Sequence, residues 1–260
     1  MSCKYLVIDK MTDGVFSVRL SRGSVNAVDR DMYIELKEIF SDIDTYCPDV
    51  RCVVLSGAGR HFCAGNDLDE FATMTPDNGA ERMWRVREAF FAIAECPVPV
   101  VGAVHGVALG TGLAIAAACD FVVAAEDALF GLPELTVGVM GGARHLARIA
   151  PQPLVRRMYF TGEPMQASAF AAAGGAVVTC NPDDLMPRAK ALAERIASFS
   201  PTALRLSKQI LDRIENEPLR RGYEIEQAGT VRMSGHPDSK EALAAFREKR
   251  AATYQPLANQ

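Results

Sequence analysis

The stretch that decides the fold is Pro97–Asp120, which reads PVPVVGAVHGVALGTGLAIAAACD. Its first half contains PVVGAV, an apolar, β-branched run that is typical of a buried strand. Glycines then interrupt the run, and GLAIAAAC follows as a helix of small apolar residues that can pack closely on a sheet. A strand, a glycine-rich turn and a helix that begins near Gly110 are the parts of an α/β unit.

The segment Ser56–Leu68, SGAGRHFCAGNDL, repeats this arrangement. An apolar strand, RCVVLSG, ends there, and Asp67, Asp69 and Glu70 suit the first turn of a helix because acidic groups favour its dipole. The first N–H groups of a helix have no acceptor within it, so two helix starts in one chain can hold one carbonyl oxygen. A glycine-rich connection that packs closely and binds no ligand is the alternative that these residues leave open.

Strands and helices alternate along the chain up to about residue 142, and helical patterns dominate after it. Because the strands are continuously apolar, this alternation predicts an α/β fold with a largely parallel sheet. We expect an α/β core over residues 1–195 and a helical C-terminal region over residues 196–260. Pro201 and the turn at residues 235–238 mark breaks in the helical part.

Composition narrows the class of protein. The chain has 260 residues, with 28 basic and 32 acidic side chains and a formal net charge of -4, which does not indicate a nucleic-acid-binding surface. No apolar run is long enough to span a membrane, and the N-terminus lacks the apolar core of a signal peptide. The seven cysteines form no CxxC pair, so we expect reduced thiols in a cytoplasmic protein without a metal site.

Three blocks in this order and spacing resemble the crotonase superfamily, which is also called the enoyl-CoA hydratase/isomerase family. They are GAGRHFCAGNDL, PVVGAVHGVALGTGLAIAAACD and ALFGLPELTVGVMGGARHLAR, and the resemblance extends to SVNAVDRDM and AFREKR. It implies a ClpP/crotonase-like spiral of ββα units with a helical C-terminal trimerisation region. The expected partners are an acyl-CoA substrate and further copies of the chain, as a homotrimer or a dimer of trimers.

The resemblance also implies an oxyanion hole made of the backbone N–H groups of Asn66 and Thr111. Thr111 replaces the usual glycine, so we expect its β-branched side chain to narrow the site or restrict the turn. The positions that match the coenzyme A groove are Ser24, Val25, Ala27, Ala64 and Leu68, and those that reach it from a neighbouring subunit are Phe246 and Lys249. Coenzyme A is then part of the substrate, and no permanently bound cofactor is expected.

Proton transfer is the point at which the sequence departs from part of the family. Hydratases of the family use two glutamates, and the matching positions here are Ala114 and Glu134. Glu134 lies in the apolar stretch ALFGLPEL, where burial raises the pKa of a carboxyl group toward neutrality and suits an acid/base. A single glutamate at this position resembles the pattern of the family's enoyl-CoA isomerases.

Several alternatives stay open at this level. The chain could be a weak hydratase, an acyl-CoA-binding pseudoenzyme without catalysis, or a hydrolase or C–C lyase that uses the same oxyanion hole. Arg144 and His145 stand where relatives usually have glycines, and they either approach the acyl pocket or face solvent or a subunit interface. The acyl group is not identified, although Met74, Met83 and Trp84 in the variable stretch Phe71–Arg87 suggest an apolar chamber.

Overall fold

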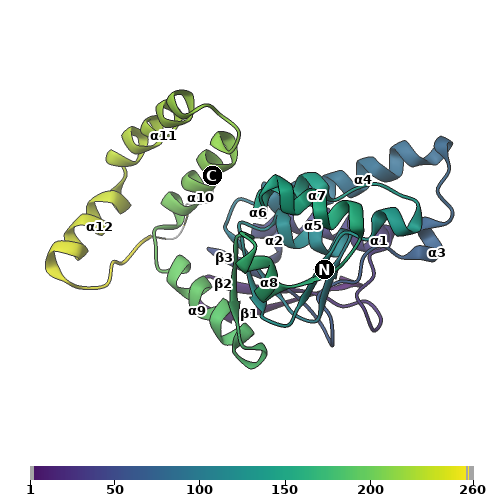
Figure 1. Ribbon diagram of the computed structural model, residues 1–260. Helices are drawn as coiled ribbons and strands as arrows, with labels where there is room; N and C mark the ends of the chain where they lie inside the picture. The colour runs from purple at the N-terminus through teal and green to yellow at the C-terminus, as the bar shows by residue number, and fades with distance from the viewer. Residues whose placement is uncertain (1–2, 256, 258–260) are drawn as a thin grey trace.

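The structure, a computed structural model, describes residues 3–255 and 257. Two β-sheets form its centre, and Figure 1 shows helices packed around them. The larger sheet has the strand order β1-β2-β3-β4-β6-β9, and the smaller has the order β5-β7-β8. The strands of the larger sheet are β1 (Leu6–Thr12), β2 (Val15–Leu20), β3 (Cys52–Gly57), β4 (Val100–Val104), β6 (Phe121–Ala125) and β9 (Val177–Cys180). Those of the smaller sheet are β5 (Val107–Leu109), β7 (Leu129–Gly131) and β8 (Met165–Gln166).

Most of the larger sheet is parallel, as the apolar strands predict. Only β1 and β2 pair antiparallel, around the turn that contains Gly14, whereas β2, β3, β4, β6 and β9 run parallel. Parallel strands are covered on both faces, which explains why β3 and β4 are apolar at nearly every position. The three strands of the smaller sheet are the elements that the sequence analysis missed, because two or three residues are too short to show a periodic pattern.

The chain winds as a spiral in which a long strand, a short extended segment and a helix repeat. After β2 the segment at Val28 pairs with Asn66, after β3 Cys63 pairs with Ala108 of β5, and after β4 the strand β5 pairs with β7. The helices that follow these segments are α1 (Arg30–Ser41), α3 (Leu68–Phe71) with α4 (Pro76–Ala94), α5 (Thr111–Ala118), and η1 (Glu134–Val137) with α6 (Ala143–Ile149). The predicted spiral of ββα units is confirmed, and it places successive helix starts beside one another.

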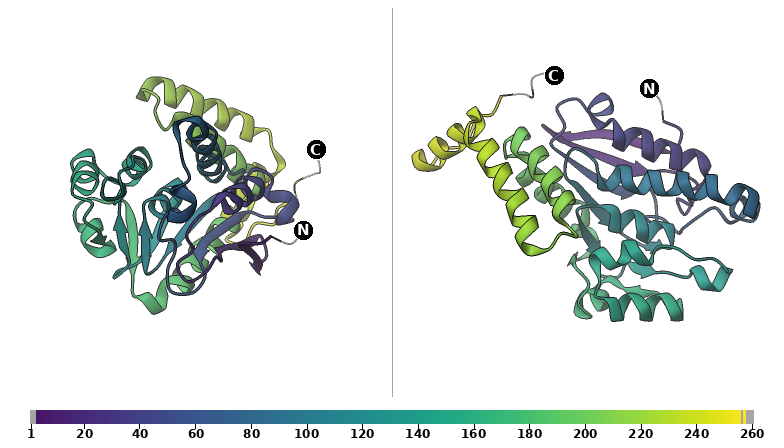
Figure 2. Two further views of the ribbon diagram at one scale, coloured as in Figure 1. Left: turned by 90° about the vertical axis from the view of Figure 1, so that its right-hand side faces the viewer. Right: turned by 90° about the horizontal axis from the view of Figure 1, so that it is seen from above.

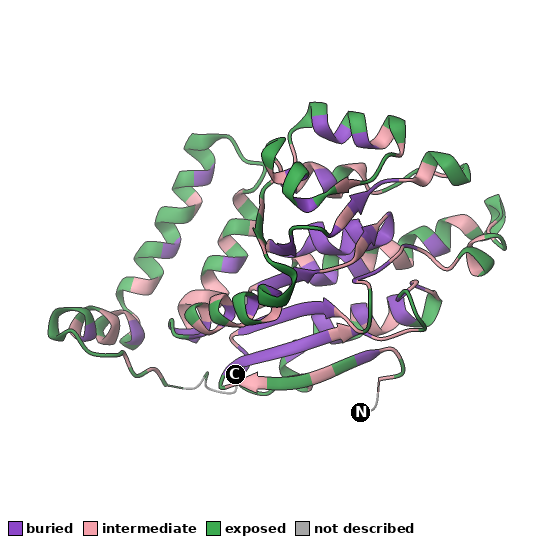
Figure 3. Cartoon of the chain, turned by 60° about the horizontal axis from the view of Figure 1, so that its bottom comes forward, coloured by how far each residue is buried: buried purple, intermediate pink, exposed green. Residues whose placement is uncertain are grey.

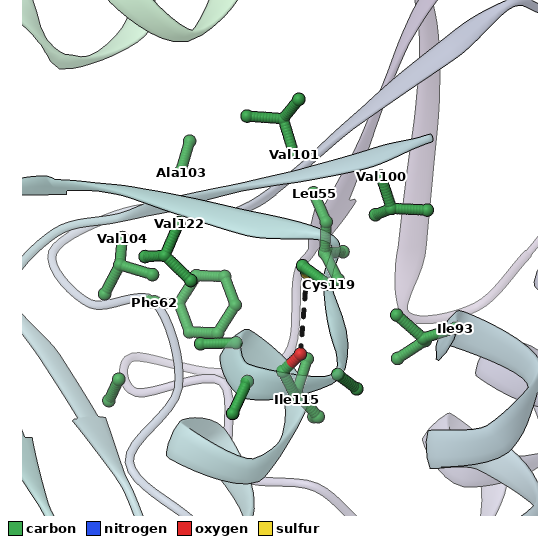
Figure 4. Close-up of a cluster of buried hydrophobic side chains, with 14 of the residues drawn as sticks. Leu55, Phe62, Ile93, Val100, Val101, Ala103, Val104, Ile115, Cys119 and Val122 are labelled. Atoms are coloured by element: carbon green, nitrogen blue, oxygen red, sulfur yellow. Dashed lines mark hydrogen bonds between the residues drawn. The ribbon is translucent and has the colours of Figure 1, made fainter. Parts of the chain in front are cut away.

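Helix α5 is the most deeply buried helix of the described residues, and every one of its residues is buried. Figure 3 shows the strands of the larger sheet and the central helix as the main buried region. In Figure 4, Leu55, Phe62 and Val122 gather around the end of α5, where the Cys119 thiol donates to the Ile115 carbonyl. The seven cysteines are free thiols, as predicted. The other helices of this part are α2 (Ile43–Tyr46), α7 (Gln152–Thr161), α8 (Ala167–Ala172), η2 (Pro182–Asp184) and α9 (Leu185–Ala197).

The last helices form an arm beside the α/β body, as Figures 1 and 2 show. They are α10 (Pro201–Ile214), α11 (Leu219–Ser234) and α12 (Pro237–Glu248). In contrast, α9 packs against β3 and β4, so it covers the sheet. The boundary at about residue 195 stays a prediction, because packing of one chain does not test independent folding. None of the helices in the described residues is long and apolar enough to cross a membrane.

An ion pair with a buried lysine anchors the arm to the body. The Lys208 ammonium on α10 lies 2.6 Å from Oδ1 of Asp120, which follows α5, and the Lys208 side chain is 2% exposed. The other oxygen of Asp120 accepts the N–H of Val100 at 2.7 Å. Removing one partner of such a pair leaves an uncompensated charge, which costs more than the pair itself contributes.

We expect Lys208→Met to lower the free energy of unfolding by more than about 1 kcal/mol, measured by urea denaturation. The matched control is Lys10→Met, because Lys10 and Asp13 form an exposed pair whose loss should cost less than about 0.5 kcal/mol. Equal, small effects of the two substitutions would mean that the Lys208 ion pair does not hold α10 in place.

Candidate active site

Two helix starts from adjacent turns of the spiral meet at Asn66 and Thr111. The Val28 N–H donates to the Gly65 carbonyl, and the Asp67 N–H donates to the Val28 carbonyl. Because successive N–H groups of an extended segment point in opposite directions, the N–H of Asn66 points away from Val28. Thr111 is the first residue of α5, and its N–H therefore precedes the helical hydrogen bonds. Within residues 3–255 neither N–H group donates to a protein acceptor.

Glycines permit the close approach of these two junctions. A Cβ atom at Gly112 would lie 2.2 Å from the carbonyl oxygen of Cys63, which is far inside van der Waals contact. The residue before α5, Gly110, has a φ of +53°, a conformation that favours glycine. Glycine at both positions is therefore needed for the loop 63–66 to lie against the start of α5.

Thr111 behaves differently from the sequence-based expectation. It has ordinary helical geometry, so its β-branched side chain does not restrict the turn, and the unusual φ belongs to Gly110. Its hydroxyl lies 2.9 Å from the Tyr33 hydroxyl and points into the protein, where it is 6% exposed as a residue. Tyr33 also donates to Oδ1 of Asn66 at 2.7 Å. Sequence reasoning missed Tyr33, and its only signal was a tyrosine within the apolar stripe of α1.

Glu134 begins η1, and its carboxylate lies against the start of α5. Its Oε1 atom is 3.0 Å from the position that a Cβ atom at Gly110 would take. Its Oε2 atom is buried and has no hydrogen-bond partner among the described residues. Burial raises the pKa of the Glu134 carboxyl, although the residue's own N–H group favours the charged form. Ala114 is 2% exposed in α5 and brings no ionisable group to the site.

The positions predicted for the coenzyme A groove lie on two neighbouring loops, residues 24–28 and 64–68, which together are called the rim below. The Ala64 N–H donates to the Val25 carbonyl at 3.0 Å, so the loop 24–28 runs beside the loop 64–68. The Arg22 guanidinium joins the same loops through Asp29 at 2.8 Å and Asp67 at 2.7 Å. The members of this rim are Ser24, Val25, Ala27, Ala64 and Leu68.

Phe246 and Lys249 lie elsewhere. Phe246 is on α12, 82% exposed, and Lys249 follows the end of that helix. Figures 1 and 2 place α12 at the outer part of the arm, away from the rim of the same chain. A contact of these two residues with coenzyme A in a neighbouring subunit is untested by a single chain.

The side chains of Arg144 and His145, at the start of α6, contact different parts of the protein. The Arg144 side chain is bonded to Oδ1 of Asn216 at 3.2 Å, so it faces the loop between α10 and α11. His145 packs edge-on against Phe90, with ring centroids 4.9 Å apart, and Phe90 in turn packs against Tyr33. Burial, together with the positive charges of Arg148 and Arg144, lowers the pKa of His145 to about 4. His145 is therefore a neutral ring at neutral pH.

The apolar chamber expected from the stretch 71–87 stays a prediction. Met83 and Trp84 are 42% and 46% exposed on α4, and the Lys37 ammonium lies over the Trp84 ring. The described residues contain no group of three or more histidine, cysteine, aspartate and glutamate side chains that could hold a metal ion.

Comparison with known proteins gives the class of the protein, a family of acyl-CoA-processing enzymes. The profile of the enoyl-CoA hydratase/isomerase family matches residues 10–256, and the chain belongs to this family. It is 33% identical over 229 residues to the 2,3-dehydroadipyl-CoA hydratase of Escherichia coli, which covers 84% of this chain and 87% of the relative. It is 32% identical to a methyl-dioxo-hexahydroindene-carboxyl-CoA hydrolase of Mycobacterium tuberculosis, over 91% of this chain and 96% of the relative.

A solved structure of similar architecture is the enoyl-CoA hydratase of Bacillus anthracis. Its TM-score is 0.91 at 31% sequence identity, and the match covers 97% of this chain and 100% of that chain. The crotonase fold predicted from the three sequence blocks is thereby confirmed. The family acts on coenzyme A thioesters and needs no permanently bound cofactor.

The low pKa of His145 should make the stability of the protein depend on pH. Unfolded histidine binds a proton near pH 6.5, but folded His145 does so only near pH 4, so acidification favours the unfolded chain. We expect wild type to lose about 2 kcal/mol more unfolding free energy than His145→Asn between pH 7 and pH 5. Urea denaturation at both pH values measures the difference, and parallel losses in the two proteins would show that folded His145 titrates normally.

Proposed function

We propose that the protein is an enoyl-CoA isomerase that moves a double bond next to the thioester. The N–H groups of Asn66 and Thr111 donate to the thioester oxygen, and Glu134 removes a proton from the α carbon. The resulting enolate carries its negative charge on the oxygen between the two donors. Glu134 then delivers a proton to the γ carbon, so the carboxylate is regenerated and the double bond has shifted by one position. The proton that Glu134 holds exchanges with water between the two steps, which makes the transfer visible in heavy water.

The observation that supports this proposal most is the buried Oε2 atom of Glu134, which has no hydrogen-bond partner among the described residues and belongs to a carboxylate beside the start of α5. A buried carboxylate oxygen without a hydrogen-bond partner is costly, and such groups call for a functional explanation. Burial also raises the pKa of this group, so that it exchanges a proton more readily near neutral pH than an exposed glutamate does. Fixed N–H donors stabilise the developing oxyanion without reorganising during the reaction.

Isomerisation is favoured over hydration by the residue at position 114. Hydration needs one group that orients and deprotonates water and another that protonates the α carbon. Ala114 is buried and supplies neither, whereas isomerisation needs only one base that serves both carbons. An enoyl-CoA hydratase with only Glu134 would be slow, because loss of a positioned acid or base typically costs about 10²- to 10⁴-fold.

Hydrolysis is the second candidate reaction, and the Mycobacterium tuberculosis relative supports it. That protein is named a hydrolase of a coenzyme A thioester of a cyclic diketone, and it is 32% identical to this chain. The same oxyanion donors would stabilise the anion formed when water attacks a carbonyl group. Product analysis separates this reaction from isomerisation, because hydrolysis adds water and breaks a bond whereas isomerisation conserves mass.

We infer that coenzyme A lies along the rim formed by Ser24, Val25, Ala27, Ala64 and Leu68. Phe246 and Lys249 of a neighbouring copy complete this groove in the proposed homotrimer or dimer of trimers. Large apolar side chains on the arm support such association, because they find no cover within one chain. They are Leu211, Leu219, Tyr223, Val231, Leu243 and Phe246.

Glu134→Gln should abolish proton transfer while leaving thioester binding nearly intact. We expect exchange of the α proton of 3-enoyl-CoA thioesters in heavy water to fall by at least about 10²-fold, measured by mass spectrometry. In wild type the exchange rate should rise with pH through the raised pKa of Glu134, since only the carboxylate accepts the proton. The midpoint of this rise should lie above the pKa of an ordinary glutamate.

The matched control is Glu163→Gln, which neutralises an exposed glutamate outside the site. It should exchange and isomerise as wild type does. A panel of 2-enoyl-CoA and 3-enoyl-CoA thioesters then reports the reaction type: 3-hydroxyacyl product would favour a hydratase, and free coenzyme A would favour a hydrolase. Unchanged turnover in Glu134→Gln would rule out the proposed role of Glu134, and no turnover in wild type would favour a binding protein.

The proposed association predicts a trimer or hexamer in solution. Light scattering should give a mass of about three or six chains, and Phe246→Ser should weaken coenzyme A binding without changing the fold of the monomer. A monomeric mass for wild type would exclude the contact of Phe246 and Lys249 with a neighbouring site.

A further inference from the structure

A hydrogen-bonded chain joins the side chains of the two residues that supply the proposed oxyanion donors. The Tyr33 hydroxyl donates to Oδ1 of Asn66 at 2.7 Å and lies 2.9 Å from Oγ1 of Thr111. A tyrosine hydroxyl has one hydrogen, so if Asn66 accepts it, Thr111 must donate to Tyr33. The chain therefore runs in one direction, from Thr111 through Tyr33 to Asn66.

Tyr33 itself has little freedom to move. It is 2% exposed, and its ring packs edge-on against Phe90 with centroids 6.2 Å apart. Phe90 is held in turn by the ring of His145. Burial also raises the pKa of the Tyr33 hydroxyl, which keeps its proton on the oxygen as a donor. The Tyr33 hydroxyl is thus held in place where α1, α4 and α5 pack together.

The hydrogen bonds of Tyr33 hold the same two residues whose backbone N–H groups face the thioester in the proposed site. A side chain that is held at its hydroxyl or amide end limits the rotation of its own Cα and of the adjoining peptide groups. Both side chains are held by the Tyr33 hydroxyl. Donors need this kind of support, because an oxyanion site loses efficiency when its groups are loosely placed.

We propose that Tyr33 is a positioning residue that couples the two oxyanion donors through its hydroxyl group. This inference rests on the proposed function, because it assigns a task to the residues around the same oxyanion hole. It also explains the threonine at position 111, since a glycine there would have no hydroxyl to join the chain. Tyr33 makes no contact with the reacting atoms in this scheme.

Tyr33→Phe tests the proposal, because it keeps the ring and removes the hydroxyl. The probe is the coenzyme A thioester of 4-dimethylaminocinnamic acid, whose absorption shifts to longer wavelength when hydrogen bonds polarise its carbonyl group. At saturation we expect the variant to show a clearly smaller shift than wild type. Its kcat for isomerisation should fall by about tenfold, and its KM should change by less than about twofold.

Thr111→Val interrupts the same chain at its other end and should reduce the shift and kcat in a similar way. Thr111→Ser, which retains a hydroxyl donor, should lose less than Thr111→Val. Because both changes break one chain, Tyr33→Phe combined with Thr111→Val should be much less harmful than the product of the two single effects. Thr161→Val, which removes an exposed threonine hydroxyl at the end of α7, is the control for Thr111→Val and should match wild type.

The outcomes separate this inference from the proposed function. A wild-type shift that persists at full size in Tyr33→Phe, with kcat unchanged, would overturn the positioning role and leave the oxyanion hole standing. Fully multiplicative effects of the two substitutions would also overturn it, since independent sites would then be at work. No shift and no turnover in wild type would overturn the proposed oxyanion hole and the role of Tyr33 together. Circular dichroism and urea midpoints confirm that each variant is folded at the assay temperature.

Discussion

The close contact between the Cys63 carbonyl and the start of α5 is the constraint on which the site depends. There is no room for a Cβ atom at Gly112, so the loop 63–66 can approach the helix to backbone distance. The N–H of Leu109 donates to the same carbonyl at 3.1 Å and fixes the register of this approach. The two helix starts therefore belong to one rigid arrangement, and Asn66 and Thr111 become neighbours although they are 45 positions apart in the sequence.

The helix dipole of α5 is not offset by charged side chains of the helix itself. A helix without a charged residue presents its own dipole, with the positive end at Thr111 and the negative end near Ala118. Arg148 satisfies the negative end by donating to the carbonyls of Ala117 and Ala118 at 2.8 and 3.1 Å. At the positive end, the N–H groups have no such protein partner in the described chain, and the Glu134 carboxylate lies nearby. The imbalance at this end is what an incoming carbonyl group would relieve.

The sequence predicts these junctions better than their surroundings because glycine-rich turns between apolar strands and helices are local patterns. The α/β class, the parallel sheet and the helix starts near Gly110 and Asp67 all rest on such patterns, and they are confirmed. The position of Glu134 beside Gly110 required the family resemblance, since nothing within ALFGLPEL specifies which turn it faces. The groove rim likewise depends on pairing between loops 24–28 and 64–68.

Tyr33 and His145 show why the side-chain contacts around the site could not be predicted from the sequence. Tyr33 falls in the apolar stripe of α1, and its hydroxyl partners are 33 and 78 positions away. The position of the His145 side chain depends on its contact with the ring of Phe90, which comes from α4. Side-chain contacts between distant turns leave no periodic signal, because each residue type suits an ordinary core on its own.

Helix α5 is held at both ends, and this links the arm to the site. Its first turn is joined to α1 through the Tyr33 hydroxyl, and the residue that follows its last turn, Asp120, pairs with Lys208 on α10. A preorganised donor must not move when charge develops, and a short buried helix that is fixed at both ends meets this requirement. The exposed apolar side chains of the arm and the placement of the proposed oxyanion donors are thus connected through one helix. The proposed association of the arm would bury Phe246 and stiffen the same helix that holds Thr111.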